Sequence, residues 1–208
     1  MPAYIAEEIA LRIARGILHP NEHLVELAIA EEFKTSRAPV REALLMLEKD
    51  KLVQKVPHRG FVVKKFSKDE IHQLYDATFR LEEIAIQKAI TNATQDDIER
   101  LEQILLDQES AIDNEDIVDF YELNEDFHAQ ILAIANNQFI TDMHQSLRRS
   151  SRPLSFLNMG QGKNMLLSYQ EHTKQFEAIK NKDVAAGVNA IREQEERSLK
   201  TLDIFYAI

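Results

Sequence analysis

Apolar side chains near the start of the chain recur every three or four positions, which is the spacing of a helix that buries one face. The pattern predicts helices over residues 4–16 and 25–33. A third helix is expected to begin after Ser36, a good N-cap residue, and to end near Asp50. Three short helices therefore open the chain.

The period then changes from helical to alternating. Residues 52–56 and 61–64 predict two short strands, and the sequence Pro57-His58-Arg59-Gly60 predicts the turn between them. Three helices followed by a β-hairpin form a winged helix-turn-helix. We therefore expect residues 1–66 to be one domain of this type.

From Ser67 onward the pattern is helical throughout. Ser67 and Glu70 have the spacing of a capping box at the start of the first helix in this part. Breaks are expected at 136–137 and 159–162. The expected helices span 67–91, 95–112, 115–136, 138–158, 164–181 and 183–206. Short loops between them predict an antiparallel all-helical bundle over residues 67–208, so the fold class is mainly α.

Charge is distributed unevenly between the two expected domains. The whole chain has a formal net charge of −10, but residues 34–65 carry nine bases and three acids. Residues 69–208 carry 13 bases and 26 acids. A polyanionic partner would attract the small domain and repel the large one. The asymmetry therefore favours a nucleic-acid partner for the winged domain.

The composition excludes several other classes of protein. The 208 residues include no Cys, so disulfides, thiolate catalysis and Cys-ligated zinc are excluded. No apolar run is long enough to cross a membrane, and acidic residues such as Glu7 and Glu8 near the start do not fit a secretory signal. We expect a cytoplasmic protein with no membrane partner.

Residues 24–63 resemble the DNA-binding domain of the GntR family of bacterial transcription regulators. The resemblance is carried by the segment SRAPVREAL at 36–44 and by the Arg59-Gly60 pair in the hairpin. These motifs fix residue types across two helices and the wing. The resemblance implies a transcription regulator that binds double-stranded DNA.

The helical part resembles the FCD effector domain of the FadR subfamily. Its marks are Leu81-Glu82, Asn124-x-x-Phe127-His128, and Glu171-His172 followed by Ala178-Ile179 and Asp183. The resemblance implies that this domain dimerises and binds a small-molecule effector, expected here to be a carboxylate metabolite.

The third helix and the hairpin tip carry the candidate DNA contacts. Arg37 and Arg41 lie one turn apart, and arginine binds guanine bidentately in the major groove, which the resemblance also implies. Arg59 is suited to the minor groove, and hydroxyls just before the helix are suited to a phosphate. The candidate set is Thr35, Ser36, Arg37, Arg41, His58, Arg59 and Gly60. The alternative is that the arginines belong to a solvated helix face.

One recognition helix covers only a few base pairs of DNA. Useful specificity needs two half-sites, so we expect a homodimer on a palindromic operator. The helical domain is the expected dimer surface.

Two histidines define a second candidate site in the helical domain. Asn124 and His128 share a helix face, and His172 is expected on a helix that faces it. The resemblance places a divalent metal, zinc or nickel, on Asn124, His128, His172 and Gln194. Asn124 and Gln194 replace the family's Asp and His, which weakens the expected metal site. A metal-free polar pocket and plain core packing are the alternatives, and His144 is expected at the surface or in helix packing.

An anionic effector also needs a cationic contact. The family often has Arg at the position of Thr78, and the nearest base here is Arg80. Arg149 and its neighbours Arg148 and Arg152 are the other candidates, because a guanidinium matches a carboxylate fork. The expected ligand-binding set is Thr78, Arg80, Asn124, His128, Arg149 and His172.

These features predict a ligand-responsive transcription regulator, in the family's commoner mode a repressor that its effector releases from the operator. The alternative is a metal-dependent hydrolase that uses His128 and His172. Catalytic metal sites usually have at least three strong protein ligands, and two are present here. The sequence also contains no P-loop, nucleophile elbow or dinucleotide motif, so we expect no enzyme activity.

Overall fold

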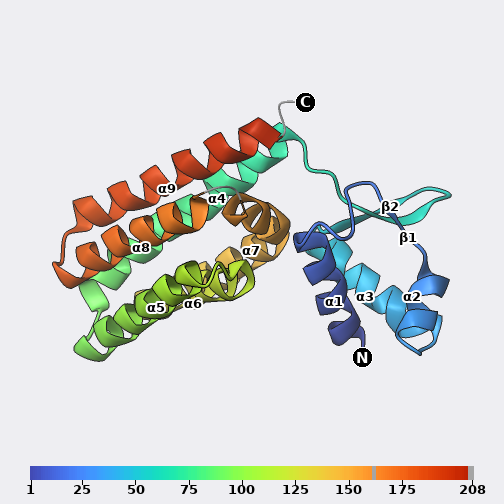
Figure 1. Ribbon diagram of the computed structural model, residues 1–208, viewed down its shortest axis with the longest axis horizontal. Helices are drawn as coiled ribbons and strands as arrows, with labels where there is room; N and C mark the ends of the chain where they lie inside the picture. Colours follow the sequence, from blue (N-terminus) through green and yellow to red (C-terminus); the bar gives the residue numbers. More distant parts are fainter. Residues whose placement is uncertain (161–162, 206–208) are drawn as a thin grey trace. The chain divides into compact units, whose positions relative to one another are not determined.

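The computed structural model describes residues 1–160 and 163–205, and these divide into two compact units (Figure 1). The first unit contains residues 1–67 together with 146–157, and the second contains the other described residues. The predicted break at 159–162 includes residues 161 and 162, which lie outside the described residues, as does residue 206 at the predicted end of the last helix.

The first unit is built on three helices and a small antiparallel sheet. Its elements in residues 1–67 are α1 (Pro2–Ala14), β1 (His23–Leu24), α2 (Glu26–Glu32), α3 (Arg37–Lys49), β2 (Val53–Val56) and β3 (Gly60–Val63). The strand order is β1-β3-β2. The predicted helices and hairpin are confirmed, while the two-residue strand β1 was missed.

The core of the first unit is apolar and is centred on α3. Val40, Leu44 and Leu47 on one face of α3 are at most 2% exposed. They join Ile5 and Ile9 of α1 in one hydrophobic cluster. Because α3 buries this face, its opposite face is held toward solvent.

The β2–β3 hairpin is closed by a tight turn. Val53 pairs with Val63 and Val56 pairs with Gly60, and the Arg59 amide donates to the Val56 carbonyl at 3.1 Å. Gly60 has a φ of +74°, in the left-handed region that favours glycine. The turn therefore fixes the hairpin tip in one conformation.

The second unit is helical in its described part. Its elements are α4 (Lys68–Asn92), α5 (Gln95–Asp113), α6 (Ile117–Ala135), the ends of α7 (Gln138–Met159), α8 (Asn164–Lys180) and α9 (Val184–Phe205). In Figure 1, α4 lies beside α9, α8 beside α9 and α5 beside α6, which agrees with their packing contacts. The predicted mainly-α fold class is confirmed, and no helix in the described ranges is long and apolar enough to cross a membrane.

Local sequence signals set several helix boundaries. Thr94 and Asp97 form a capping box at the start of α5, and Asn136 ends α6 in a left-handed conformation with a φ of 50°. Asp183 accepts a hydrogen bond from the Ala186 amide at the start of α9. Ser36 occupies the N-cap of α3 as predicted, but its side chain makes no capping hydrogen bond.

Gly187 allows α9 to approach α4 closely. A Cβ atom at this position would lie 2.7 Å from Ile90 Cδ1 and 3.2 Å from Ile86 Cγ1. We expect Gly187→Val to lower the free energy of unfolding by about 1–3 kcal/mol, because the added methyl groups overpack this contact. Urea denaturation of the full chain measures the change. Ala185→Val, at an exposed position of the same helix, is the control and should cost less than about 0.7 kcal/mol.

Candidate functional site

The candidate DNA contacts lie on the exposed parts of α3 and the hairpin. The Arg37 side chain is 68% exposed and its Nη2 lies 3.0 Å from Glu26 Oε2. Arg41 is exposed one turn later, on the side of α3 away from the buried residues. Two guanidinium groups are thus presented outward from one helix, which is the arrangement that reading a major groove requires.

The remaining DNA-contact candidates lie at the hairpin tip and just before α3 in the winged domain. His58, Arg59 and Gly60 are exposed at the hairpin tip, and Ser36 is exposed at the N-terminus of α3, while Thr35 is half-buried. A helix N-terminus with an available hydroxyl is a suitable partner for a phosphate.

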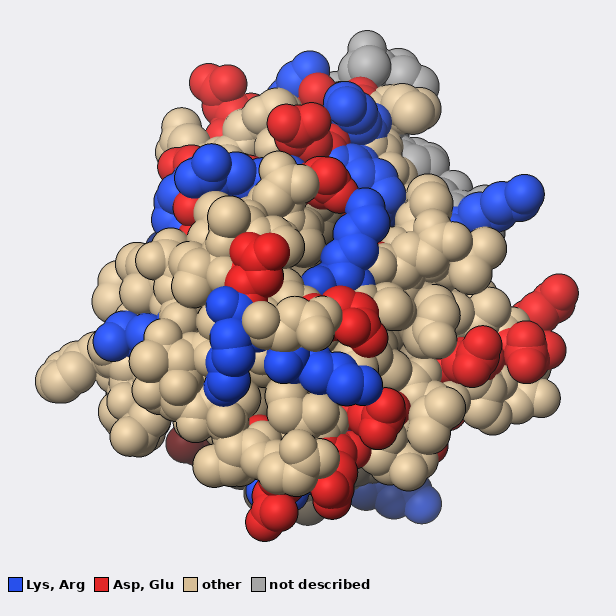
Figure 2. Space-filling view, turned by 90° about the vertical axis from the view of Figure 1, so that its left-hand side faces the viewer, with Lys and Arg blue, Asp and Glu red and all other residues tan. Residues whose placement is uncertain are grey.

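Figure 2 shows a different charge pattern at the end of the molecule where α8 turns into α9. Lys and Arg side chains there are interspersed with Asp and Glu side chains. Charges of opposite sign largely cancel over such a surface. This face therefore offers no broad cationic patch to a phosphate backbone.

The interior of the helical bundle is polar, in contrast to the apolar core around α3. Among the described residues, the buried polar and charged side chains all lie at Thr78 or later in the chain. They include Thr78, Glu82, Gln108, Asn124, His128, His144, Glu171, His172, Gln175 and Gln194. Buried polar groups need hydrogen-bond partners, so such an interior is a candidate ligand site.

Glu82 joins two of the histidines. Its Oε1 lies 2.8 Å from His144 Nε2 and 3.6 Å from His128 Nδ1, and all three side chains are at most 6% exposed. The three residues come from α4, α7 and α6. The contacts tie these helices together through one carboxylate.

His172 completes the group from α8. Its ring stacks on Phe127 with a centroid separation of 4.4 Å and lies 5.2 Å from the ring of His128. His172 Nδ1 lies 2.9 Å from Gln108 Oε1, and Gln108 Nε2 donates to the Leu123 carbonyl at 3.1 Å. Because the Gln108 amide is oriented by that second bond, Nδ1 of His172 is the donor and carries the proton.

Two family profiles match this chain, one over each of its two parts. Residues 73–196 match the profile of the FCD domain, and residues 3–63 match the profile described as bacterial regulatory proteins, gntR family. The chain belongs to the GntR family. This GntR protein is therefore a DNA-binding transcription regulator with an FCD domain.

Relatives of this GntR regulator align with it over most of their length. The HTH-type transcriptional repressor RspR of Escherichia coli (strain K12) is 27% identical over 86% of this chain and 80% of that protein. The gluconate operon transcriptional repressor of Bacillus subtilis (strain 168) is 26% identical over 91% of this chain and 79% of that protein. The solved structure of E. coli McbR/YncC has a TM-score of 0.83 at 22% identity, covering 99% of this chain and 98% of that one, and it shows the same fold. None of these names supports the hydrolase alternative.

The four residues that the GntR resemblance assigns as metal ligands make other contacts in this structure. Asn124 donates to Glu125 Oε1 at 3.1 Å, and Gln194 Oε1 accepts from Gln175 Nε2 at 2.9 Å. Within residues 1–160 and 163–205, no group of three or more His, Asp or Glu side chains is arranged to hold a metal ion. Two imidazoles and two amides are a weak donor set for zinc or nickel, so these residues do not fit the metal.

The candidate anion contacts of the GntR regulator are engaged with groups of the protein itself. The Thr78 hydroxyl donates to the Leu74 carbonyl of its own helix at 2.8 Å. Arg149, 52% exposed, lies in the part of α7 that belongs to the first unit and pairs with Asp50 at 2.9 Å. Arg80 is 47% exposed and pairs with carboxylates of α4 and α9.

The pKa values of two carboxyls that pair with Arg80 are shifted in opposite directions. A hydrogen bond from Arg192, together with the charge of Arg80, lowers the pKa of Glu83. Burial raises the pKa of Glu195, although Arg80 lies 3.0 Å from it and opposes the shift. These ion pairs link α4 to α9, so the Arg80 guanidinium is already paired with carboxylates of the protein.

Sequence reasoning missed several members of the buried polar group. His144 was expected at the surface or in helix packing; it is 2% exposed between helices, and its bond to Glu82 was not predicted. Gln108 and Gln175, both 0% exposed, were not considered. The available signal was polar residues at positions where the helical period requires an apolar side chain.

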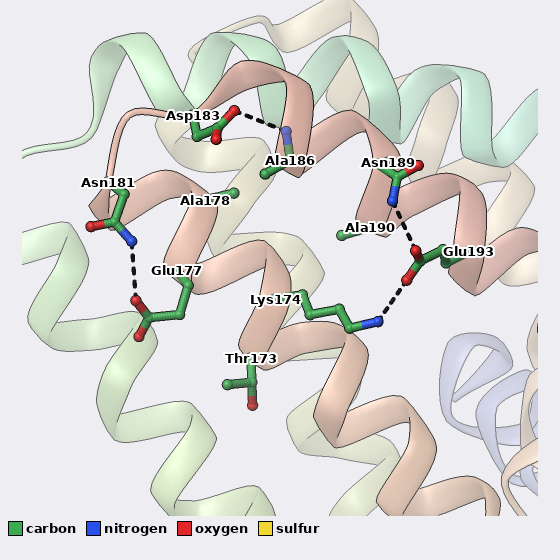
Figure 3. Close-up of a pocket in the computed structure, with 10 residues that line it drawn as sticks. All are labelled: Thr173, Lys174, Glu177, Ala178, Asn181, Asp183, Ala186, Asn189, Ala190 and Glu193. Carbon is green, nitrogen blue, oxygen red and sulfur yellow. Dashed lines mark hydrogen bonds and ion pairs between the residues drawn. The ribbon is translucent and has the colours of Figure 1, made fainter.

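A groove of about 460 Å³ on the outer side of α8 and α9 is a separate feature of this GntR regulator (Figure 3). Its polar side chains are satisfied internally. Glu193 accepts from Lys174 at 2.6 Å and from Asn189 at 2.8 Å, and Glu177 accepts from Asn181 at 3.2 Å. The groove therefore has few polar groups left for a ligand.

Proposed function

We propose that this GntR regulator is a repressor whose homodimer binds a palindromic operator and is released by a small metabolite. The observation that carries the proposal is the outward presentation of Arg37, Arg41 and Arg59 by a folded winged domain. The repressor names of two relatives support the direction of regulation. A cytoplasmic location belongs to the same proposal, because the operator is there.

In this proposal α3 enters the major groove and the hairpin tip reaches the adjacent minor groove. Arg37 and Arg41 bind guanine edges, Arg59 lies in the minor groove, and Ser36 holds a phosphate. Thr35, His58 and Gly60 complete the contact set near the backbone. The Arg37–Glu26 ion pair does not oppose this, because an exposed pair contributes at most about 1 kcal/mol.

A homodimer is required because two half-sites must be read together. α7 offers a surface for it, since Phe139 is 84% exposed and Met143, one turn later, is 59% exposed. Large apolar side chains exposed together are typical of a protein contact surface. We propose that a second copy of the chain covers them.

If a second copy of the chain covers Phe139 and Met143, charged side chains at these positions should separate the two copies. Phe139→Glu combined with Met143→Glu should convert the dimer to a monomer in light scattering after size exclusion, because two charges would be buried in each half of the contact. Specific operator binding should fall with the loss of the second half-site. Leu106→Glu on the exposed side of α5 is the control. A double variant that remains dimeric contradicts this assignment.

The effector in this proposal is a carboxylate metabolite that binds within the buried polar group of the helical bundle. The relative named for a gluconate operon is in line with an organic acid. Release from DNA requires that the effector bind the DNA-incompetent dimer more tightly than the DNA-bound form.

Operator binding in the presence of candidate acids tests the proposed function. Fluorescence anisotropy with a palindromic duplex should show specific binding that weakens steeply with salt, because phosphate contacts release counterions. An effector should shift the binding curve to higher protein concentration. Equal binding to the palindrome and to a scrambled duplex at every salt concentration would contradict the proposal.

A further inference from the structure

Arg197 of α9 is a largely buried arginine that the sequence did not single out. Its side chain is 18% exposed and that of its partner Glu171 on α8 is 9% exposed. Arg197 Nε lies 2.5 Å from Glu171 Oε1, and Nη2 lies 2.8 Å from Oε2. Its Nη1 is 3.4 Å from Asn158 Oδ1. The two parallel bonds are the geometry in which arginine recognises a carboxylate.

This pair adjoins the buried polar group described above. Glu171 precedes His172, and Gln175 lies four residues further along α8, on the same helix face. Gln194 lies three residues before Arg197 on α9, and its Oε1 accepts from Gln175 at 2.9 Å. The amide pair and the ion pair are therefore neighbouring links between the same two helices.

Gln175 provides an independent observation at the same place. It is 0% exposed, and its Oε1 has no hydrogen-bond partner in the described part of the chain. A buried acceptor left without a donor is unfavourable, so its presence needs an explanation. A hydroxyl group of a bound molecule would supply the missing donor.

We propose that Glu171 occupies the place of the effector's carboxylate in the unliganded protein. A small hydroxycarboxylate displaces Glu171 from Arg197 and donates a hydroxyl hydrogen bond to Gln175 Oε1, without a metal. Arg197 thus replaces the cationic contact that Thr78, Arg80 and Arg149 do not provide. This inference rests on the proposed function, since it names the effector class and its anchor.

Competition from Glu171 for Arg197 explains why the ligand needs both a carboxylate and a hydroxyl group. Glu171 is held beside Arg197 by the fold, so it competes at a high effective concentration. A carboxylate alone exchanges one ion pair for another and leaves the Glu171 carboxylate without its arginine, which is unfavourable. A hydroxyl adds a bond that the unliganded protein lacks, and this addition favours the exchange.

Isothermal titration calorimetry of the full chain with three compounds, two acids and one sugar alcohol, tests the inference. Gluconate carries both groups, hexanoate only the carboxylate, and sorbitol only hydroxyls. The wild type should bind gluconate more tightly than hexanoate and should not bind sorbitol. Glu171→Gln should bind gluconate and hexanoate with an affinity at least about tenfold higher than that of the wild type, because the competing carboxylate charge of residue 171 is gone. Treatment with EDTA should change none of these affinities.

A second variant separates recognition from folding. Arg197→Gln alone leaves Glu171 buried without its partner and is expected to destabilise the fold. The double variant Glu171→Gln with Arg197→Gln removes both charges and keeps the side-chain volumes, so its melting should stay close to that of Glu171→Gln. It should bind none of the three compounds. Gluconate binding by this variant at wild-type affinity, or no gain of acid binding in Glu171→Gln, overturns the inference.

Duplex binding by the same samples keeps this result distinct from the proposed function. If the wild type does not bind the palindrome specifically, the proposed function is contradicted. The acid affinities still test whether Arg197 anchors the ligand carboxylate. Specific palindrome binding together with equal gluconate affinity in wild type and double variant overturns the inference alone.

Discussion

Substitution of Arg37 by alanine is expected to abolish specific operator binding by the proposed homodimer. The substitution removes one bidentate base contact from each half-site, and such a contact is worth about 1–3 kcal/mol. Over two half-sites the expected loss is roughly 30-fold to more than 10,000-fold in affinity. It also removes the 3.0 Å partner of Glu26, so an uncompensated negative charge is left next to the proposed DNA contact and adds repulsion.

The fold should survive this substitution. The Arg37 side chain is 68% exposed, and its removal should change the free energy of unfolding by less than about 0.5 kcal/mol. Anisotropy titrations against the palindrome and a scrambled duplex at matched salt measure the effect. Arg100→Ala, at an exposed position of α5, is the control and should bind like the wild type. Unchanged palindrome binding by Arg37→Ala would refute the role given to α3.

The second large effect is expected at Phe127. This side chain is 0% exposed and stacks on the His172 ring at 4.4 Å. Phe127→Ala should lower the free energy of unfolding by about 3–5 kcal/mol, because it removes buried apolar area and leaves a cavity. The loss of the stacked ring should also weaken the proposed effector binding, since it releases one of the contacts that orient His172.

Urea denaturation followed by far-UV circular dichroism measures the stability change. Leu106→Ala, at a position of α5 that is 55% exposed, is the matched control and should cost less than about 0.5 kcal/mol. A loss at Phe127 no larger than at Leu106 would mean that the ring does not support the interior of the bundle.

The element order of the winged domain was predictable because its signals are local. The apolar period, the Ser36 N-cap position and the turn before Gly60 each depend on residues near one another in sequence. The strand β1 was not predictable, since His23 and Leu24 are too few to show an alternation. Their pairing with Val62 and Phe61 is set by the tertiary fold.

The interior of the helical bundle was predictable only in part. The spacing of Asn124 and His128 places them on one helix face, and the structure brings His172 beside His128, as expected. Glu82 and His144 are 62 positions apart, and Glu171 and Arg197 are 26 apart. A helical period indicates which face of a helix is buried but not which face it meets, so these partners required the structure.

The sequence also does not show which arginine contacts an anionic ligand, because the partner of each arginine is set by the fold. A guanidinium can pair with any carboxylate that the fold brings near it, and the sequence does not rank Arg149 below Arg197. The fold turns Arg149 to Asp50 and leaves it 52% exposed, whereas it turns Arg197 into the interior. Thr78 takes the position of the family's arginine and bonds only to its own helix backbone among the contacts described.

Selection of duplexes from a random-sequence DNA pool by the full-length protein tests the central claim most directly. The claim is that two winged domains read one stretch of DNA through α3 and the hairpin. The account predicts enrichment of an inverted repeat whose half-sites are about one helical turn apart, and loss of that enrichment in the Arg37→Ala protein. Recovery of no common sequence, or of the same sequence by the wild-type and Arg37→Ala proteins, would contradict it.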